Sequence, residues 1–302
     1  MASPVMRELD RMLRAVAAKD VTVTLVGESG AGKEVMARRL HDLSPRRGGP
    51  FVPINCAAIP DALFESELFG HERGAFTGAT ERSEGKIEMA AGGTLFLDEV
   101  AEMPLALQPK LLRFLETHRF MRVGGTKKLD VDVRVVLATL RPLEEEVRAG
   151  RFRADLFYRI QAIVLTVPPL RERRRDIPAL IDAFAAQLAA IHDCDLPKLT
   201  RGARAVLLAH DWPGNVRQLR NVIEFVTILR AGRPVRVQDL PPGLNRASSS
   251  AGDTLAVDLG QPLEAIVDRV IEHVVAAEQG NLTRAARRLG VSVRTLQRRR
   301  RA

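Results

Sequence analysis

Cysteine is scarce in this chain, which has only Cys56 and Cys194 among its 302 residues. Two thiols so far apart in sequence are too few for a disulfide framework or a zinc knuckle, so both are expected to be ordinary buried thiols. The six histidines do not cluster with metal-ligand spacing. His71 and Glu72 begin like the zinc-protease motif H-E-x-x-H, but Ala75 stands where the second histidine belongs. These absences exclude a disulfide-stapled domain and a zinc protease.

Long uncharged apolar runs are also missing. The N-terminal segment is interrupted by charges at Arg7, Glu8, Asp10, Arg11 and Arg14. We therefore expect no targeting segment, no membrane partner and a cytoplasmic location. A length of 302 residues is enough for two or three compact units with a sizeable core.

Positive charge is concentrated at one end. The net charge is +9, but residues 281–302 hold eight arginines and no acid, which leaves +1 for residues 1–280. Such a run is either a solvated basic tail or a surface that contacts nucleic acid.

Phosphate-binding chemistry is concentrated in the segment Gly27-Glu28-Ser29-Gly30-Ala31-Gly32-Lys33-Glu34. An apolar run at 21–26 precedes it and a helical pattern at 34–43 follows. A strand, a glycine-rich turn and a helix N-terminus form a cradle of backbone N–H groups for phosphate oxygens. The spacing G-x-x-x-x-G-K is met, but Glu34 stands where Ser or Thr usually holds magnesium. The alternative is a flexible turn that happens to hold these residues.

A second strand ends in two acids. The apolar run at 94–97 leads to Asp98 and Glu99, which places both carboxylates at the carboxyl end of a buried strand, where α/β sheets bind ligands. Asp98 can hold Mg²⁺, and Glu99 can orient or deprotonate an attacking water. Thr139 ends another apolar run and can sense the γ-phosphate or that water. A solvated turn at each strand end is the alternative.

Three arginines are candidates for phosphate contacts. Arg153 and Arg159 are poorly placed for their own phosphate loop, so we expect them to act across a subunit boundary, where an arginine finger is worth ~10³–10⁵ in rate. An ion pair between Asp155 and Arg159 is the plain alternative. Arg217 follows a Trp-Pro-Gly break and would face the nucleotide if a helical lid folds down.

Residues 70–85 read GHERGAFTGATERSEG, a glycine-rich polar stretch where an α/β unit ordinarily has a short connection. Helical patterning returns at residue 86, which indicates a loop projecting within or between helices. An aromatic and a threonine held between glycines suit a mobile contact finger; an idle surface loop is the alternative.

The patterning divides the chain into four parts: an α/β unit at 1–168 with a parallel sheet covered by helices on both faces, a small all-α unit at 169–240, a linker at 241–261 rich in proline, glycine and serine, and a helical unit at 262–302. The last unit is patterned as helix, break, helix, turn and helix, which predicts a helix-turn-helix. Asn281 or Thr283 can cap its second helix and Ser292 its third. Leu289, Val291 and Leu296 would be its apolar pins. We expect base-edge contacts from Arg294, Thr295, Gln297 and Arg298, and phosphate contacts from Arg284, Arg299, Arg300 and Arg301.

From Glu67 to Ala79 the sequence resembles the sigma-54-dependent transcriptional activators, bacterial enhancer-binding proteins of the AAA+ superfamily. The resemblance covers about residues 8–240 and resumes at 262, where the chain is similar to the family's Fis-type DNA-binding domain. It implies a P-loop AAA+ ATPase with a lid, which uses ATP and Mg²⁺ in a homo-oligomer, a hexameric ring, and which binds upstream double-stranded DNA as two-fold dimers. The implied activity is ATP-driven conversion of sigma-54 RNA polymerase holoenzyme from closed to open promoter complex.

The resemblance also implies roles for single residues. Glu34 matches the family's own phosphate loop, and Asn55 is the switch that restrains Glu99. Arg153 and Arg159 are the trans-acting fingers, and Arg217 is the lid's phosphate sensor. The loop that touches sigma-54 consists of Gly74, Ala75, Phe76, Thr77, Gly78 and Ala79.

Two departures and two rival functions stay open at this stage. Leu140 stands where the family commonly has Asn or His after the sensor threonine. No receiver or ligand-sensing domain precedes the ATPase, so either a separate protein regulates it or the polypeptide is a fragment or remnant. The rivals are a DNA-binding regulator that uses ATP only as an assembly ligand, and an AAA+ remodeller of another substrate.

Overall fold

The structure is a computed structural model that describes residues 3–244, 263–278, 280–293 and 295–296. The chain separates into two compact units. The first consists of Met1–Arg204 with Asp211–Asp239, and the second of Ala205–His210 with Leu240–Ala302. None of the described helices is both long and apolar enough to cross a bilayer.

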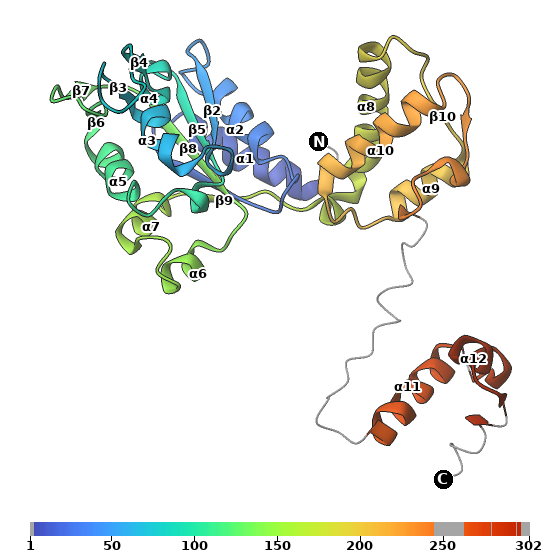
Figure 1. Ribbon diagram of the computed structural model, residues 1–302. Helices are drawn as coiled ribbons and strands as arrows, with labels where there is room; N and C mark the ends of the chain where they lie inside the picture. The colour runs from blue at the N-terminus through green and yellow to red at the C-terminus, as the bar shows by residue number, and fades with distance from the viewer. Residues whose placement is uncertain (1–2, 245–262, 279, 294, 297–302) are drawn as a thin grey trace. The chain divides into compact units, whose positions relative to one another are not determined.

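A five-stranded parallel sheet organises the first unit, in the order β2-β5-β8-β1-β9 (Figure 1). The expected parallel sheet is thus confirmed, and its strands lie within or close to the apolar runs of the sequence. The strands are β1 (Val23–Val26), β2 (Phe51–Asn55), β5 (Thr94–Asp98), β8 (Arg134–Thr139) and β9 (Val164–Thr166).

Helices cover both faces of this sheet, because successive strand residues point to opposite sides. Leu95 and Leu97 of β5 pack in one core cluster with helices α3 (Asp61–Phe69), α5 (Gln108–Thr117) and α7 (Ala154–Ile160). Phe96, between them, packs in the other cluster with α1 (Pro4–Ala17) and α2 (Lys33–Asp42). The helices and short helical turns of this part are α1 (Pro4–Ala17), α2 (Lys33–Asp42), η1 (Cys56–Ala58), α3 (Asp61–Phe69), α4 (Lys86–Met89), η2 (Val100–Glu102), α5 (Gln108–Thr117), α6 (Leu143–Arg148) and α7 (Ala154–Ile160).

The first helix, α1, was not predicted from the sequence. Ser3 caps it through a hydrogen bond from the Met6 backbone N–H to its hydroxyl, and Pro4 occupies its first turn. Its buried residues, Met6, Leu9, Leu13 and Ala17, recur at helical spacing. The cap and the periodicity were both present in the sequence, so this helix was predictable.

Two hairpins interrupt the helical layer on the α3 side. Strands β3 (Gly70–His71) and β4 (Ser83–Glu84) pair antiparallel and close the base of the glycine-rich loop. Strands β6 (Arg119–Phe120) and β7 (Leu129–Asp130) form the second hairpin. The predicted projecting segment is therefore a loop held at its base by a two-stranded ladder.

After the sheet, the chain is mainly helical. Its three longer helices are separated near 193–200 and at the Trp-Pro-Gly break at 212–214, where Trp212 is fully buried. Two-residue strands also pair there in parallel. The elements are η3 (Leu170–Asp176), α8 (Ile177–Ile191), β10 (Lys198–Leu199), α9 (Arg201–Ala209), α10 (Asn215–Leu229), β11 (Pro234–Val235) and η4 (Val237–Asp239).

The second unit contains the helices α11 (Leu263–Ala277) and α12 (Leu282–Leu289). Ala285 and Ala286 are buried against Ile271 and Val275, as small residues at a close helix crossing. Val293, Thr295 and Leu296 are helical as well. The order helix, helix, turn and helical residues agrees with the expected helix-turn-helix. Of its expected apolar pins, Leu296 is fully buried, Leu289 is partly buried, and Val291 is 40% exposed, so Val291 is not a core residue.

Candidate functional site

Parallel strands bring the predicted site residues to one edge of the sheet. Asn55 and Asp98 are register partners at the ends of β2 and β5. Val26 and Thr139 are partners at the ends of β1 and β8, and the Gly27 backbone N–H donates to the Thr139 carbonyl over 3.3 Å. Residues from four strand ends thus converge, as in other α/β ligand sites.

The phosphate loop has the backbone geometry of an anion cradle. Gly30 and Gly32 have φ angles of +70° and +99°, which favour glycine, and an added Cβ at Gly32 would meet nothing within 4 Å. Helix α2 begins at Lys33 with no side-chain cap, so the N–H groups of its first turn are left for a ligand. An open approach, uncapped N–H groups and a lysine fit a phosphate group.

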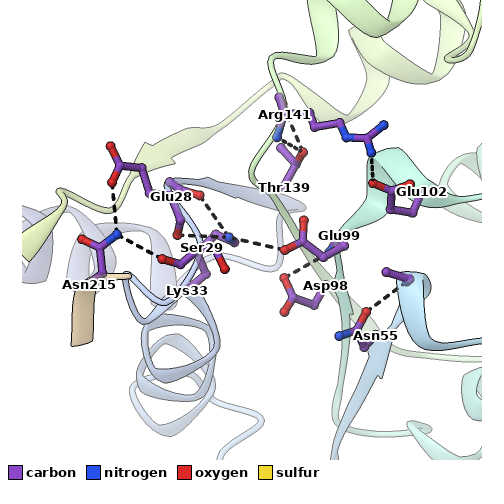
Figure 2. A network of polar contacts seen from close by, with 12 residues as sticks. Glu28, Ser29, Lys33, Asn55, Asp98, Glu99, Glu102, Thr139, Arg141 and Asn215 are labelled. Carbon is purple, nitrogen blue, oxygen red and sulfur yellow. Dashed lines mark hydrogen bonds and ion pairs between the residues drawn. The ribbon is translucent and has the colours of Figure 1, made fainter. Parts of the chain in front are cut away.

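Lys33 faces Glu99 across this cradle (Figure 2). Its ammonium group is buried, donates to the Gly27 carbonyl over 3.0 Å and lies 3.8 Å from Glu99 Oε1. Burial raises the pKa of Glu99 above its ordinary value, whereas Lys33 opposes that rise. Glu99 has a left-handed φ of 55°, an uncommon conformation for this residue type. The site therefore holds a partly desolvated carboxylate next to a cation, as suits a group that activates water.

The remaining strand-end residues make local hydrogen bonds. Asp98 accepts one from the Glu99 backbone N–H, and Thr139 Oγ1 accepts one from the Arg141 backbone N–H. Asn55 Oδ1 accepts from the Ala57 backbone N–H and so caps η1. Among the described residues this is the one hydrogen bond of the Asn55 side chain, so the implied Asn55–Glu99 restraint stays a prediction.

The helical segment after the sheet reaches the phosphate loop, as the lid interpretation requires. Arg217, in the first turn of α10, donates to the Ser29 hydroxyl over 3.1 Å. Asn215, which begins α10, donates to Glu28 Oε2 and to the Ser29 carbonyl over 3.1 and 3.0 Å. Arg171 forms a two-point ion pair with Glu28. The Glu28 carboxylate thus faces the lid. The nucleotide contact that we expect of this loop residue stays a prediction. Asn215 and Arg171 were not predicted.

Arg153 and Arg159 do not contact the phosphate loop in this chain. Arg153 precedes α7 and pairs with Asp155 over 2.7 Å, while Arg159 donates to the Leu115 carbonyl. The ion pair offered as the plain alternative, Asp155 with Arg159, is replaced by the one with Arg153. The Arg153 side chain is 45% exposed, and its hydrogen bonds lower the pKa of Asp155. Arg153 is thus accessible to another subunit.

The glycine-hinged loop presents its tip to solvent. Gly74 and Gly78 have φ angles of +80° and +101°, with open space at both Cβ positions. The Gly74 N–H donates to the Ala79 carbonyl over 2.8 Å, which closes the loop. Phe76 is 41% exposed although its ring packs edge-on against His71 at 4.9 Å, and Thr77 is exposed. Ala75 is partly buried and Ala79 is buried.

The structure describes only part of the predicted DNA-contact set. Arg284 lies at the start of α12 and forms a 3.0 Å ion pair with Glu278. Asn281 caps α12, one of the two caps that we expected, and Ser292 caps the turn before Thr295, whose hydroxyl bonds to it. The other predicted contacts, Arg294, Gln297, Arg298, Arg299, Arg300 and Arg301, lie outside the described residues.

Comparison with protein families agrees with this geometry. Residues 1–166 match the model of the sigma-54 interaction domain, 171–256 that of an AAA+ ATPase lid domain, and 263–302 that of bacterial regulatory proteins of the Fis family.

The chain belongs to the sigma-54-dependent activator family.

Curated relatives support the same assignment. This activator chain is 42% identical to the regulatory protein AtoC of Escherichia coli K12 over 299 residues, which are 97% of the chain and 65% of AtoC. It is 43% identical to the response regulator PilR of Pseudomonas aeruginosa over 298 residues, which are 97% of the chain and 67% of PilR. The chain therefore spans about two thirds of the length of these relatives.

Solved structures resemble this activator as well. NtrX from Brucella abortus in complex with ATP superposes with a TM-score of 0.74 at 38% identity, covering 98% of the chain and 67% of NtrX. The ADP complex of NtrX superposes with a TM-score of 0.77 at 37% identity, covering 99% of the chain and 68% of NtrX. The relatives thus include a nucleotide-binding protein of this fold, which agrees with an ATPase-type first domain.

Proposed function

We propose that this activator hydrolyses ATP with Mg²⁺ between subunits of a homo-oligomeric ring and uses the energy to convert sigma-54 RNA polymerase from closed to open promoter complex. The observation that carries the proposal is the pairing of a partly desolvated Glu99 with Lys33 at an uncapped helix N-terminus. A cation and a carboxylate of raised pKa beside a phosphate cradle suit the hydrolysis of a phosphoanhydride.

Each residue of the site has a task in this proposal. The N–H groups at the start of α2 and the Lys33 ammonium hold the outer phosphates, and Asp98 supplies the protein carboxylate for Mg²⁺, which neutralises phosphate charge when bound. Glu99 orients or deprotonates the water, with Thr139 beside it at the sheet edge. Arg217 approaches from the lid. Arg153 and Arg159, which do not reach their own phosphate loop, serve the neighbouring subunit.

Coupling to the contact loop follows from the order of the elements. Asn55 ends β2 and Glu99 directly follows the neighbouring strand β5, so the Asn55 amide can exchange its Ala57 contact for one with Glu99 when the γ-phosphate is present. β2 leads through η1 to α3, and α3 leads directly to β3 at the base of the glycine-hinged loop. In our proposal a change at Asn55 reaches Gly74–Ala79 along this path.

The C-terminal unit supplies the anchor on DNA. Fis-type helix-turn-helix units and an arginine-rich end suit binding to an upstream site through phosphates and base edges. Two-fold dimers would read half-sites about one helical turn (~34–36 Å) apart.

Thr77→Ala tests the proposal. The side chain is exposed at the loop tip, far from the phosphate cradle in the order of elements, so ATPase activity should survive while open-complex formation at a sigma-54 promoter is lost. Promoter melting is measured by permanganate reactivity, and Thr80→Ala, just beyond the hexapeptide, is the matched control. Full promoter melting by the Thr77→Ala protein would refute the proposed role of this loop, whereas no melting by the native protein would favour a remodeller of another substrate.

A further inference from the structure

The lid contacts four consecutive residues of the phosphate loop. In addition to the bonds at Glu28 and Ser29, the Val216 backbone N–H donates to the Gly30 carbonyl over 3.0 Å. The buried guanidinium of Arg173 donates to the Ala31 carbonyl. A Cβ at Gly30 would lie 2.5 Å from the Gly214 carbonyl oxygen, so the two backbones are already in close contact.

Asn215 is at the centre of this contact. It is fully buried and has a left-handed φ of 52°, which asparagine tolerates better than most residues. Its Oδ1 accepts from the Leu170 backbone N–H over 2.8 Å, and its Nδ2 group donates to Glu28 and Ser29. Figure 2 shows the contacts of Asn215 with Glu28 and Ser29. Through these and its bond from Leu170, one amide joins the start of the lid, the phosphate loop and the helix that carries Arg217.

Glu28 is the charged partner of that amide. Its two carboxylate oxygens accept from both terminal nitrogens of Arg171, at 2.6 and 2.8 Å, and Oε2 also accepts from Asn215. The Arg171 hydrogen bonds, followed by that of Asn215, lower the pKa of Glu28 to about 2. The carboxylate is therefore ionised at neutral pH and already bound on the lid side.

We propose that Asn215 is a positioning residue for nucleotide binding, which locks the lid onto the ionised Glu28 so that Arg217, two residues later, is held over the phosphate loop. The Glu28 carboxylate belongs to this lock, and in our proposal it holds the lid and not the nucleotide. The inference rests on the proposed function only in placing the nucleotide at this loop.

A mutant cycle tests the lock in the full chain, with a fluorescent ATP analogue and Mg²⁺ as the probe. Asn215→Asp keeps the shape but removes both donors and sets a second carboxylate against Glu28, so binding should weaken about tenfold, the scale of a hydrogen bond to a charged group. Adding Glu28→Gln to this variant returns the summed charge of positions 28, 171 and 215 to its native value. It also restores an amide–carboxylate pair, with the two groups exchanged. It should recover about a third or more of the lost affinity on a logarithmic scale.

Arg217 supplies the readout that a general loss of packing would not change. Arg217→Ala should weaken binding about tenfold in the native background but less than about twofold in the Asn215→Asp background, because the arginine is then already displaced. Asn221→Asp makes the same chemical change at an exposed position of α10 and should bind as the native protein does. If Asn215→Asp does not fold, as judged by its melting curve, Arg171→Gln replaces it with the same expected coupling to Arg217.

Unchanged affinity in Asn215→Asp, or full additivity with Arg217→Ala, would overturn the lock. These measurements need no polymerase and no hydrolysis. A protein that fails at the sigma-54 promoter while the cycle holds refutes the proposed function alone. One that melts the promoter while Asn215→Asp binds normally refutes the lock alone.

Discussion

Replacing Glu99 with glutamine separates the chemistry of the site from its stability. At an effective dielectric constant of about 20, charges 3.8 Å apart, as Lys33 Nζ and Glu99 Oε1 are, attract by about 4 kcal/mol. Desolvation opposes that attraction, and the pKa of Glu99 is raised on balance, so burial of its charge outweighs the help from Lys33. A raised pKa means that folding does not favour the ionised form of Glu99, and Lys33 keeps its bond to the Gly27 carbonyl, so the free energy of unfolding should change by less than about 1 kcal/mol.

The rate of ATP hydrolysis, unlike the free energy of unfolding, should fall strongly. Loss of a general base removes about 10²–10⁴ in rate, or about 2.7–5.5 kcal/mol of transition-state stabilisation. The assay is steady-state phosphate release at saturating ATP and Mg²⁺, beside a thermal melt and an ATP-binding titration. Glu102→Gln is the matched control: it removes a carboxylate three residues further on, where Glu102 pairs with Arg141 over 2.6 Å, and should leave turnover within about twofold.

Equal, slow phosphate release by the native protein and Glu99→Gln would refute this reasoning. The nucleotide would then be an assembly ligand and the protein a DNA-binding regulator without turnover. A large loss of stability in Glu99→Gln would instead show that the Lys33–Glu99 contact is chiefly structural.

Three further predictions concern other parts of the molecule. The stability that the ionised Glu28 carboxylate contributes should be fully present above its ordinary pKa of 4.5 and should be lost as the pH falls towards about 2. Since the side chains of Glu28 and Arg171 are each about 40% exposed, the free energy of unfolding should fall by about 1 kcal/mol. Urea unfolding across this pH range measures the loss, which should be absent in Glu28→Gln. Mixing Arg153→Ala with Glu99→Gln subunits should restore part of the ATPase activity that each lacks alone, because one shared site then has both groups; no restoration would count against a trans-acting arginine. Arg284→Ala should weaken DNA binding equally for all DNA sequences and reduce the slope of log affinity against log salt concentration by about 1. An unchanged slope would mean that Arg284 contacts no phosphate and serves its ion pair with Glu278.

The site's backbone was predictable because its signals are local. The spacing of Gly27, Gly32 and Lys33 after an apolar run is enough to predict a strand, a turn and a helix start, and the structure has all three. Asp98 and Glu99 follow a buried run in the same way. The carboxyl edge of a parallel sheet then brings these segments together without further information.

The partners of charged side chains were not predictable, because they depend on the tertiary fold. Glu28 pairs with Arg171, 143 residues later in the chain, and nothing near Glu28 in the sequence indicates it. Asp155 shows a local failure: helical spacing favoured Arg159, but Arg153 precedes the helix with extended backbone and its side chain folds onto Asp155. Helix α1, by contrast, has local signals in the sequence, the cap Ser3 and the first-turn Pro4, which predict its start.

The close approach of Gly30 to Gly214 affects how mutagenesis of this loop should be interpreted. Any substitution at Gly30 pushes a methyl group into a carbonyl oxygen of another segment, at 2.5 Å. A screen that scores only ATP retention would record such a variant as a defect in phosphate recognition. The actual defect would be a steric clash between two backbone segments. Second-site substitutions that suppress it would then lie in the Trp212–Asn215 turn rather than in the loop itself.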